Sequence, residues 1–189
     1  MRQIIKDFVA MCAVLLPYEE PVYEFGSYQV QGQELFGDLR PYFPGKSYVG
    51  CDMRMGPGVD RILDLQQIDL PDESVGLVLS LDTLDHVEDP RLALKEIHRI
   101  LKPNGIVVIS SFLNFPIYDS QTDYWRFTPA AFASMMKPFD LVYTDYAGEE
   151  IFPHTVVGIG IKGNSLLEHN KKLLQHYLSV WRAESYHQR

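Results

Sequence analysis

Three short segments in the first third of the chain combine apolar residues with an acid. They are Val22 to Gly26, Tyr48 to Asp52, and the pair Asp64 and Leu65. Buried strands present polar groups at their carboxyl ends, and in an open parallel sheet ligands bind at that edge. Carboxylates accept hydrogen bonds from ribose hydroxyls and from an adenine amine. The pattern therefore predicts a parallel α/β sheet that binds a nucleoside-bearing cofactor.

Length and charge limit the other classes of protein. A chain of 189 residues that is 46% hydrophobic can bury one core. We expect one compact unit, with residues 1–163 forming the main domain and 164–189 a C-terminal helix of the same domain. The formal charge of -8 argues against a general nucleic-acid surface, which needs positive charge to displace counterions.

Cysteine usage and the longest apolar run predict the cellular compartment of the protein. Cys12 and Cys51 lie in apolar segments without metal-ligand spacing, so we expect reduced core residues and no metal site. The apolar run from Phe8 to Leu16 is too short to span a bilayer and has no clear cleavage site. We therefore expect a cytoplasmic protein that has no membrane segment.

Apolar segments with strand and helix patterns alternate along the chain. Helices are predicted at Arg2 to Leu16 and at Pro90 to Leu101, where Asp89 caps the first turn and Leu92, Ile97, Ile100 and Leu101 form the apolar face. Further helices are expected between most of the strands. The predicted strands are Pro21 to Phe25, Ser47 to Cys51, Val75 to Leu81, Gly105 to Ser111, Leu141 to Tyr146 and Thr155 to Lys162.

The last two predicted strands have no long helix between them. An antiparallel hairpin is therefore expected at the end of an otherwise parallel sheet with right-handed crossovers. The predicted fold class is α/β, a Rossmann-like doubly wound, mostly parallel sheet of about seven strands with an antiparallel last strand.

The motifs between Val22 and Gly163 resemble those of class I S-adenosylmethionine-dependent methyltransferases, in the small-molecule branch called type 11. The most specific part runs from Leu77 to Gly105 and includes a Leu-x-His-Val turn at His86 and a Glu-x-x-Arg-x-Leu-Lys-Pro-x-Gly helix end. The segment Asp123 to Pro129 is similar to one found in part of that branch. The resemblance implies S-adenosylmethionine as cofactor and a small-molecule acceptor.

The resemblance also implies which residues bind the cofactor. The first strand and its loop would approach the methionine portion, Asp52 would bind the ribose hydroxyls with Met53 near the adenine, and Asp64 would lie near the adenine amine. Tyr28 departs from the family, in which a second glycine is common at this position. The predicted cofactor-binding residues are Glu24, Phe25, Gly26, Ser27, Asp52, Met53, Asp64, Leu65 and Leu81.

Asp82 and His86 are the candidate catalytic residues. Asp82 follows the predicted strand Val75 to Leu81, where it would steer the positive sulfonium or accept a proton. His86 has an intrinsic pKa suited to acid-base work near neutral pH. Its alternative role is to frame the cofactor pocket.

The least patterned segment, Phe112 to Arg126, is expected to recognise the substrate. Tyr124 and Trp125 would form an aromatic wall, and the planar fork of Arg126 would hold a carboxylate or phosphate. Alternatively, the two aromatic residues anchor the loop in the core and Arg126 pairs with a local acid.

The stretch from Ser165 to Trp181 carries apolar residues at helical spacing. Packing against its own sheet is one interpretation, and a homodimer face is the other.

Two other functions stay open. One is a cofactor-binding protein without enzymatic activity, and the other is a nicotinamide-dependent oxidoreductase, although the first loop lacks G-x-G-x-x-G.

Overall fold

A computed structural model describes the chain except for residues 31, 33, 118–120, 165 and 186–189. The sheet has seven strands in the order β3-β2-β1-β4-β5-β7-β6. Strands β1 to β5 are parallel, β7 runs antiparallel to β5, and β6 pairs antiparallel with β7. The expected fold class and terminal hairpin are thus confirmed. The strands are β1 Val22–Phe25, β2 Tyr48–Asp52, β3 Arg61–Ile62, β4 Val75–Leu81, β5 Leu101–Phe112, β6 Leu141–Glu149 and β7 Phe152–Ile161.

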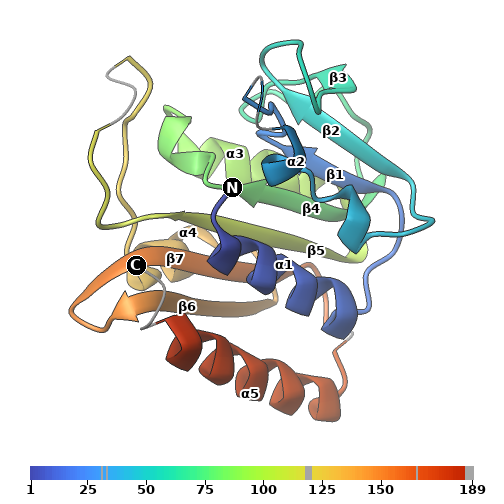
Figure 1. Ribbon diagram of the computed structural model, residues 1–189. Helices are drawn as coiled ribbons and strands as arrows, with labels where there is room; N and C mark the ends of the chain where they lie inside the picture. The colour runs from blue at the N-terminus through green and yellow to red at the C-terminus, as the bar shows by residue number, and fades with distance from the viewer. Residues whose placement is uncertain (31, 33, 118–120, 165, 186–189) are drawn as a thin grey trace.

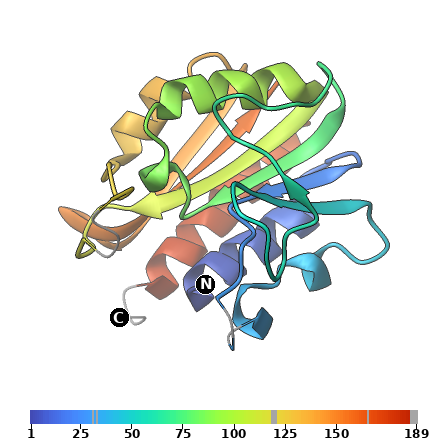
Figure 2. The ribbon, with the colours of Figure 1, turned by 90° about the horizontal axis from the view of Figure 1, so that it is seen from above.

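Helices cover both faces of the sheet (Figures 1 and 2). Helices α1 (Gln3–Leu15) and α5 (Glu168–Ser185) lie on one face, and α3 (Pro90–Ile100) and α4 (Pro129–Met135) lie on the other. Each face has its own buried apolar cluster, one built around Phe8 and Trp181 and the other around Phe132. Strands β1 and β4 are buried along their whole length because they lie between the two layers.

The connections on the β3 side of the sheet contain less helix than expected. Between β1 and β2 the described residues form only the short helix α2 (Glu34–Gly37) and a 3-10 turn, Arg40–Tyr42. In the described residues no helix lies between β2 and β4. The expectation of helices between most strands is therefore wrong here, because short loops such as Gly56 to Gly58 make these connections.

Helix α3 begins where Asp89 was expected to cap it. The Asp89 side chain accepts hydrogen bonds from the backbone N–H groups of Arg91 and Leu92, at 3.1 and 3.0 Å. The predicted apolar face is confirmed at Ile97 and Ile100, which are fully buried, but Leu92 is 39% exposed. Leu92 lies in the first turn and off the buried stripe, which Leu94 joins instead.

Helix α5 packs on the N-terminal helix. Trp181 is buried, its ring centroid lies 5.4 Å from that of Phe8, and its indole N–H donates to the Ile4 carbonyl oxygen at 2.9 Å. Leu174 and Leu178 are buried in the same cluster. These apolar residues are used within the chain, and the homodimer stays a prediction.

In the described part of the chain, no helix combines the length and the apolar character needed to cross a bilayer.

Candidate active site

A cavity of about 520 Å³ lies at the carboxyl ends of β1, β2 and β4. Its wall includes acids from three separate segments, together with a glycine from the first loop. The structure thus brings together many of the predicted site residues, which here are Phe25, Gly26, Asp52, Met53, Asp64, Leu65, Asp82 and His86.

Gly26 lets the β1 loop pass close to the end of β4. Its φ is +84°, and a Cβ built at this position would lie 2.1 Å from Thr83 Oγ1. The Gly26 and Ser27 N–H groups both donate to the Cys51 carbonyl oxygen, at 2.9 and 3.0 Å. Only glycine fits this conformation and this contact, so the residue type follows from the geometry of the site.

Asp52 and Asp64 are each held by a local turn. Asp52 Oδ1 accepts from the Arg54 N–H at 3.0 Å, and Asp64 Oδ1 accepts from the Gln66 N–H at 2.8 Å. These are side-chain turns in which an aspartate bonds the backbone two residues further on. Each carboxylate is thereby fixed at the cavity wall.

Tyr28, which stands where the family commonly has a glycine, is part of the same wall. Its ring lies 4.4 Å from the Arg54 guanidinium carbon. A Cβ on Gly56 would come within 2.3 Å of the Tyr28 ring, so Gly56 makes room for it. Tyr28 thus occupies the position of the glycine that is common in the family, and its ring packs against Gly56. The sequence alone did not show this contact.

Asp82 adopts a left-handed backbone conformation, with a φ of 48°. Its N–H donates to the Ser110 carbonyl oxygen at 3.0 Å, and the Ser110 hydroxyl donates to Oδ1 at 2.8 Å. On the other side, Arg2 Nη2 lies 3.2 and 3.1 Å from the two carboxylate oxygens. Arg2 was not predicted as a site residue, because no local signal links the start of α1 to β4.

His86 is held on both sides. Its Nδ1 lies 3.0 Å from the Thr122 carbonyl oxygen, and its Nε2 lies 3.6 Å from Asp85 Oδ2. Burial raises the pKa of the Asp85 carboxyl, and the Ser111 hydroxyl donates to this carboxyl at 3.1 Å. These contacts suit a framing role, and acid-base work by His86 stays a prediction.

Three of the predicted cofactor residues do not line the cavity: Glu24, Ser27 and Leu81. Ser27 is buried and donates to the Cys51 carbonyl oxygen at 3.2 Å. Glu24 is buried and accepts from the Tyr48 hydroxyl at 2.7 Å. Burial raises the pKa of the Glu24 carboxyl to about 7, although the hydrogen bond from Tyr48 lowers it.

The predicted substrate residues brace the loop after β5. The Tyr124 N–H donates to the Asp85 carbonyl oxygen at 2.8 Å, and Trp125 Nε1 donates to the Val87 carbonyl oxygen at 2.9 Å. Arg126 pairs with Asp123 and donates to the Phe115 carbonyl oxygen at 3.1 Å. The pairing of Arg126 agrees with the alternative interpretation, but Tyr124 and Trp125 are 47% and 43% exposed and do not anchor the loop in the core. Substrate recognition by the three residues stays a prediction. Tyr118 and Asp119 of the same segment lie outside the described residues.

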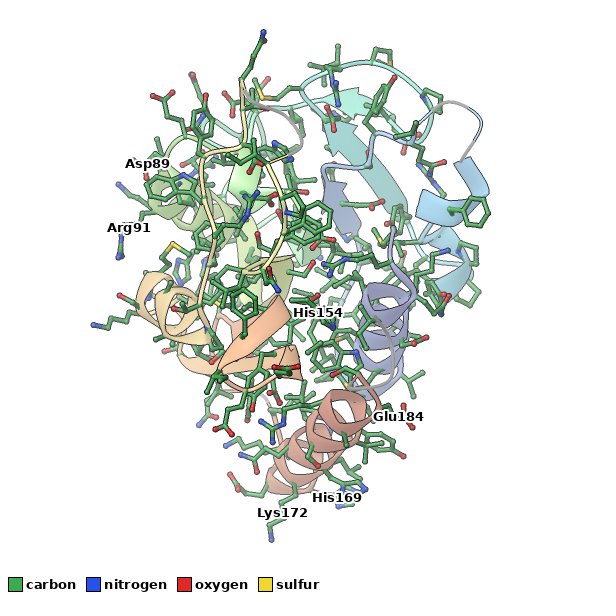
Figure 3. The ribbon with its side chains drawn as sticks, turned by 60° about the vertical axis from the view of Figure 1, so that its left-hand side comes forward. Asp89, Arg91, His154, His169, Lys172 and Glu184 are labelled. Atoms are coloured by element: carbon green, nitrogen blue, oxygen red, sulfur yellow. The ribbon has the colours of Figure 1, made fainter. Side chains whose placement is uncertain are left out.

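A second cavity of about 790 Å³ lies between the start of α1, the loop after β5 and the β6–β7 hairpin. Figure 3 shows His154 near the hairpin and α1, whereas His169 and Lys172 project outward from α5. No sequence pattern predicted this cavity, because residues distant in the sequence form it. Its lining residues include Arg2, Asn114, Phe115, Glu149, Phe152 and His154.

The first cavity has the chemistry that S-adenosylmethionine needs. Asp52 and Asp64 offer carboxylate acceptors for hydroxyl and amine donors, Met53 offers an exposed apolar surface, and Asp82 is an anion on the same wall. Among the described residues, no group of three or more His, Cys, Asp or Glu side chains could hold a metal ion. The residues present therefore fit a nucleoside cofactor.

Comparisons with known proteins agree with this geometry. Residues 46–109 match the family model described as a methyltransferase domain, and no curated protein matches the chain. An S-adenosylmethionine-dependent methyltransferase from Mesorhizobium loti is similar, with a TM-score of 0.59, 16% identity, and 82% of this chain and 97% of that chain covered. The 1,6-didemethyltoxoflavin-N1-methyltransferase of Burkholderia thailandensis was solved with bound 1,6-didemethyltoxoflavin and S-adenosylhomocysteine. It is also similar, with a TM-score of 0.59, 16% identity, and 85% of this chain and 77% of that chain covered.

A methyltransferase chain of Haloferax volcanii, solved in complex with the Trm112 methyltransferase activator, is similar as well. The TM-score is 0.60, the identity is 16%, and 86% of this chain and 91% of that chain are covered. The strand order, the family match and these structures are all consistent with a class I methyltransferase, and the chain has the fold of that family.

Proposed function

We propose that this protein transfers a methyl group from S-adenosylmethionine to a small-molecule acceptor. The observation that carries the proposal is the single cavity in which Asp52, Asp64 and Asp82 meet beside Gly26. The matched methyltransferase domain spans β2, β3 and β4, which supply these three acids or directly precede them.

Three residues of the first cavity have roles in this proposal. Asp52 accepts hydrogen bonds from the ribose hydroxyls, Asp64 accepts from the adenine amine, and Gly26 lets the methionine portion approach the backbone. When bound, the cofactor supplies a methyl group already activated on a positive sulfur. The protein then has to orient this group toward the acceptor and exclude water.

The proposal is tested by calorimetric titration with S-adenosylmethionine and S-adenosylhomocysteine. Saturable binding is expected, and Asp52→Asn should weaken the binding of both ligands at least about tenfold, since it removes a charge-assisted hydrogen bond of about 1.5 kcal/mol or more. Asp69→Asn is the matched control, because Asp69 is an exposed acid between β3 and β4 that does not line the cavity.

Folded wild-type protein that binds neither ligand would refute the proposal. Binding without methyl transfer to any acceptor would instead favour the non-enzymatic alternative. Binding of a nicotinamide cofactor in the same cavity would favour an oxidoreductase, which the absence of G-x-G-x-x-G after β1 already argues against.

A further inference from the structure

The ion pair between Arg2 and Asp82 connects the two cavities. Asp82 lines the first cavity and Arg2 lines the second. The Arg2 guanidinium stacks on the Phe112 ring, with its carbon 4.2 Å from the ring centroid, and Nη1 donates to the Thr155 hydroxyl. A group passing directly from one cavity to the other would meet this guanidinium.

Arg2 is held, but its hydrogen bonding is incomplete. Its Nε is buried and has no hydrogen-bond partner among the described residues. Because Nη1 donates to Thr155, the Thr155 hydroxyl proton remains available for His154 Nδ1, which lies 2.8 Å away. Burial, with Arg2 nearby, lowers the pKa of the His154 imidazole. The boundary between the cavities thus contains the Arg2–Asp82 ion pair and His154, with the Met1 ammonium and the Asp85 carboxyl close enough to act electrostatically on Asp82.

A sulfonium in the first cavity would change this charge balance. The Asp82 carboxylate would then be shared between the sulfonium and Arg2, whereas Asp52 and Asp64 on the same wall are each held by their own turn. Because Arg2 is paired with Asp82, its repulsion would offset the attraction of the sulfonium to Asp82. The excess positive charge is relieved when Arg2 gains a second anion on the side of the second cavity.

We propose that the second cavity is the acceptor site, and that Arg2 leaves Asp82 to pair with an anionic group of the acceptor when a sulfonium occupies the first cavity. This inference rests on the proposed function. Phe115 and Phe152 supply partly exposed aromatic walls, 39% and 58% exposed, which suit a small aromatic acceptor that carries a carboxylate or a phenolate. Glu149 is the acidic residue among the described lining residues. It is the last residue of β6 and pairs with Phe152 in the hairpin, so it does not belong to the Arg2–Asp82 boundary.

An anionic acceptor also explains how the reaction proceeds without a base. With the cofactor held by Asp52, Asp64 and Gly26, the acceptor oxygen would supply the electron pair for the new bond to the methyl carbon, and the electron pair of the carbon–sulfur bond would stay on sulfur. The acceptor anion would leave as a neutral ether or ester. No proton is transferred, so neither His86 nor His154 has to accept one.

The first test compares S-adenosylmethionine with S-adenosylhomocysteine, which lacks the methyl group and the positive charge on sulfur. The ratio of their dissociation constants isolates the effect of that charge. In wild-type protein this ratio should be close to one, because Arg2 balances Asp82. Arg2→Gln should raise the preference for the charged ligand about tenfold, and Asp82→Asn should lower it by a similar factor.

The double variant of Arg2→Gln and Asp82→Asn should return the ratio to near the wild-type value. Arg91→Gln is the matched control, since Arg91 is an exposed arginine on α3 outside both cavities (Figure 3). A ratio that Arg2→Gln changes less than about twofold would overturn the role of Arg2 while leaving the proposed function intact. Wild-type protein that binds neither ligand would instead refute the proposed function.

The second test addresses the chemical class of the acceptor with benzoate and its neutral counterpart benzamide. The imidazole NMR signals of His154 report on the second cavity, and those of the exposed His169 are the control (Figure 3). With S-adenosylmethionine bound, benzoate should shift the His154 signals at concentrations several times lower than benzamide, and Arg2→Gln should abolish the difference. Equal shifts by both probes, or shifts by neither, would overturn recognition of an aromatic anion.

Discussion

The two cavities are built in opposite ways. In the first cavity, Asp52 and Asp64 are each positioned by a hydrogen bond to a backbone N–H only two residues further along the chain. In the second, Arg2 reaches Thr155 and Asp82, which are 153 and 80 residues away. Turns between near neighbours have recognisable sequence patterns, whereas contacts over such separations have none. The residues of the first cavity could therefore be recognised in the sequence, and those of the second cavity could not.

The largest expected effect concerns the packing that supports the second cavity. Trp181→Ala removes a buried ring from between α5 and α1 and should lower the free energy of unfolding by about 4 kcal/mol. Chemical denaturation measures the loss. Tyr177→Ala on the same helix is the control, because Tyr177 is 45% exposed and should cost about 1 kcal/mol or less.

A dependence of oligomeric state on Tyr177 would show that α5 also forms a homodimer face. If Trp181→Ala lowered the free energy of unfolding only slightly, α5 would not hold the start of α1 in place. The second cavity would then not depend on packing between distant segments, contrary to the comparison of the two cavities.

The next effect concerns Glu24, the predicted site residue that is buried beside the first cavity. Its pKa in the folded protein is about 7, raised from 4.5, so the folded state binds more protons than the unfolded state between these two values. Stability from this group is fully present below pH 4.5 and is lost as the pH rises through about 7. Glu24→Gln should remove this dependence and raise the free energy of unfolding at pH 8 by up to about 3 kcal/mol.

Denaturation at pH 5 and pH 8 measures the difference between the variant and the wild type. The gain at pH 8 should disappear near pH 4. If Glu24→Gln and the wild type differed in free energy of unfolding by the same amount at pH 5 and pH 8, Glu24 would be ionised in the folded protein at both pH values. Weaker cofactor binding by the variant would support the predicted cofactor role of Glu24.

Gly26→Ala tests whether the first cavity depends on the close approach of two loops. The added Cβ would clash with Thr83 Oγ1, so the free energy of unfolding should be about 2 kcal/mol lower than that of Gly45→Ala. Cofactor binding should also be lost. Gly45 is the matched control, since its φ is +72° and nothing lies within 4 Å of a Cβ there. Similar stability and intact cofactor binding in both variants would contradict the clash.

The smallest effect concerns a purely local feature of the fold. Asp89→Ala removes the N-cap of α3 and should lower the free energy of unfolding by about 1 kcal/mol without changing cofactor affinity. Asp89→Asn keeps a capping oxygen and should stay close to wild type. A change in cofactor affinity in Asp89→Ala would show that the cap also positions the turn at His86.

The predicted site residues that meet in the first cavity share one property. Asp52 ends β2, Asp64 and Asp82 come just after β3 and β4, and the parallel order of the strands brings all three to one edge. Glu24 was also assigned to that edge, but it lies within β1 and its side chain meets Tyr48 instead of the cavity. The alternation of side chains along a strand decides this, and a four-residue buried strand has no alternating pattern in its sequence.

The sequence by itself determined the parallel sheet with its antiparallel hairpin, the cap of α3 and the acids of the first cavity. These depend on periodicity, turn chemistry and strand order, which act over short stretches of chain. The tertiary structure alone decided that Arg2 pairs with Asp82, that Tyr28 packs on Gly56 and that a second cavity opens beside His154. Those contacts exist only because the folded sheet and its two helical layers bring distant residues within a few ångströms of each other.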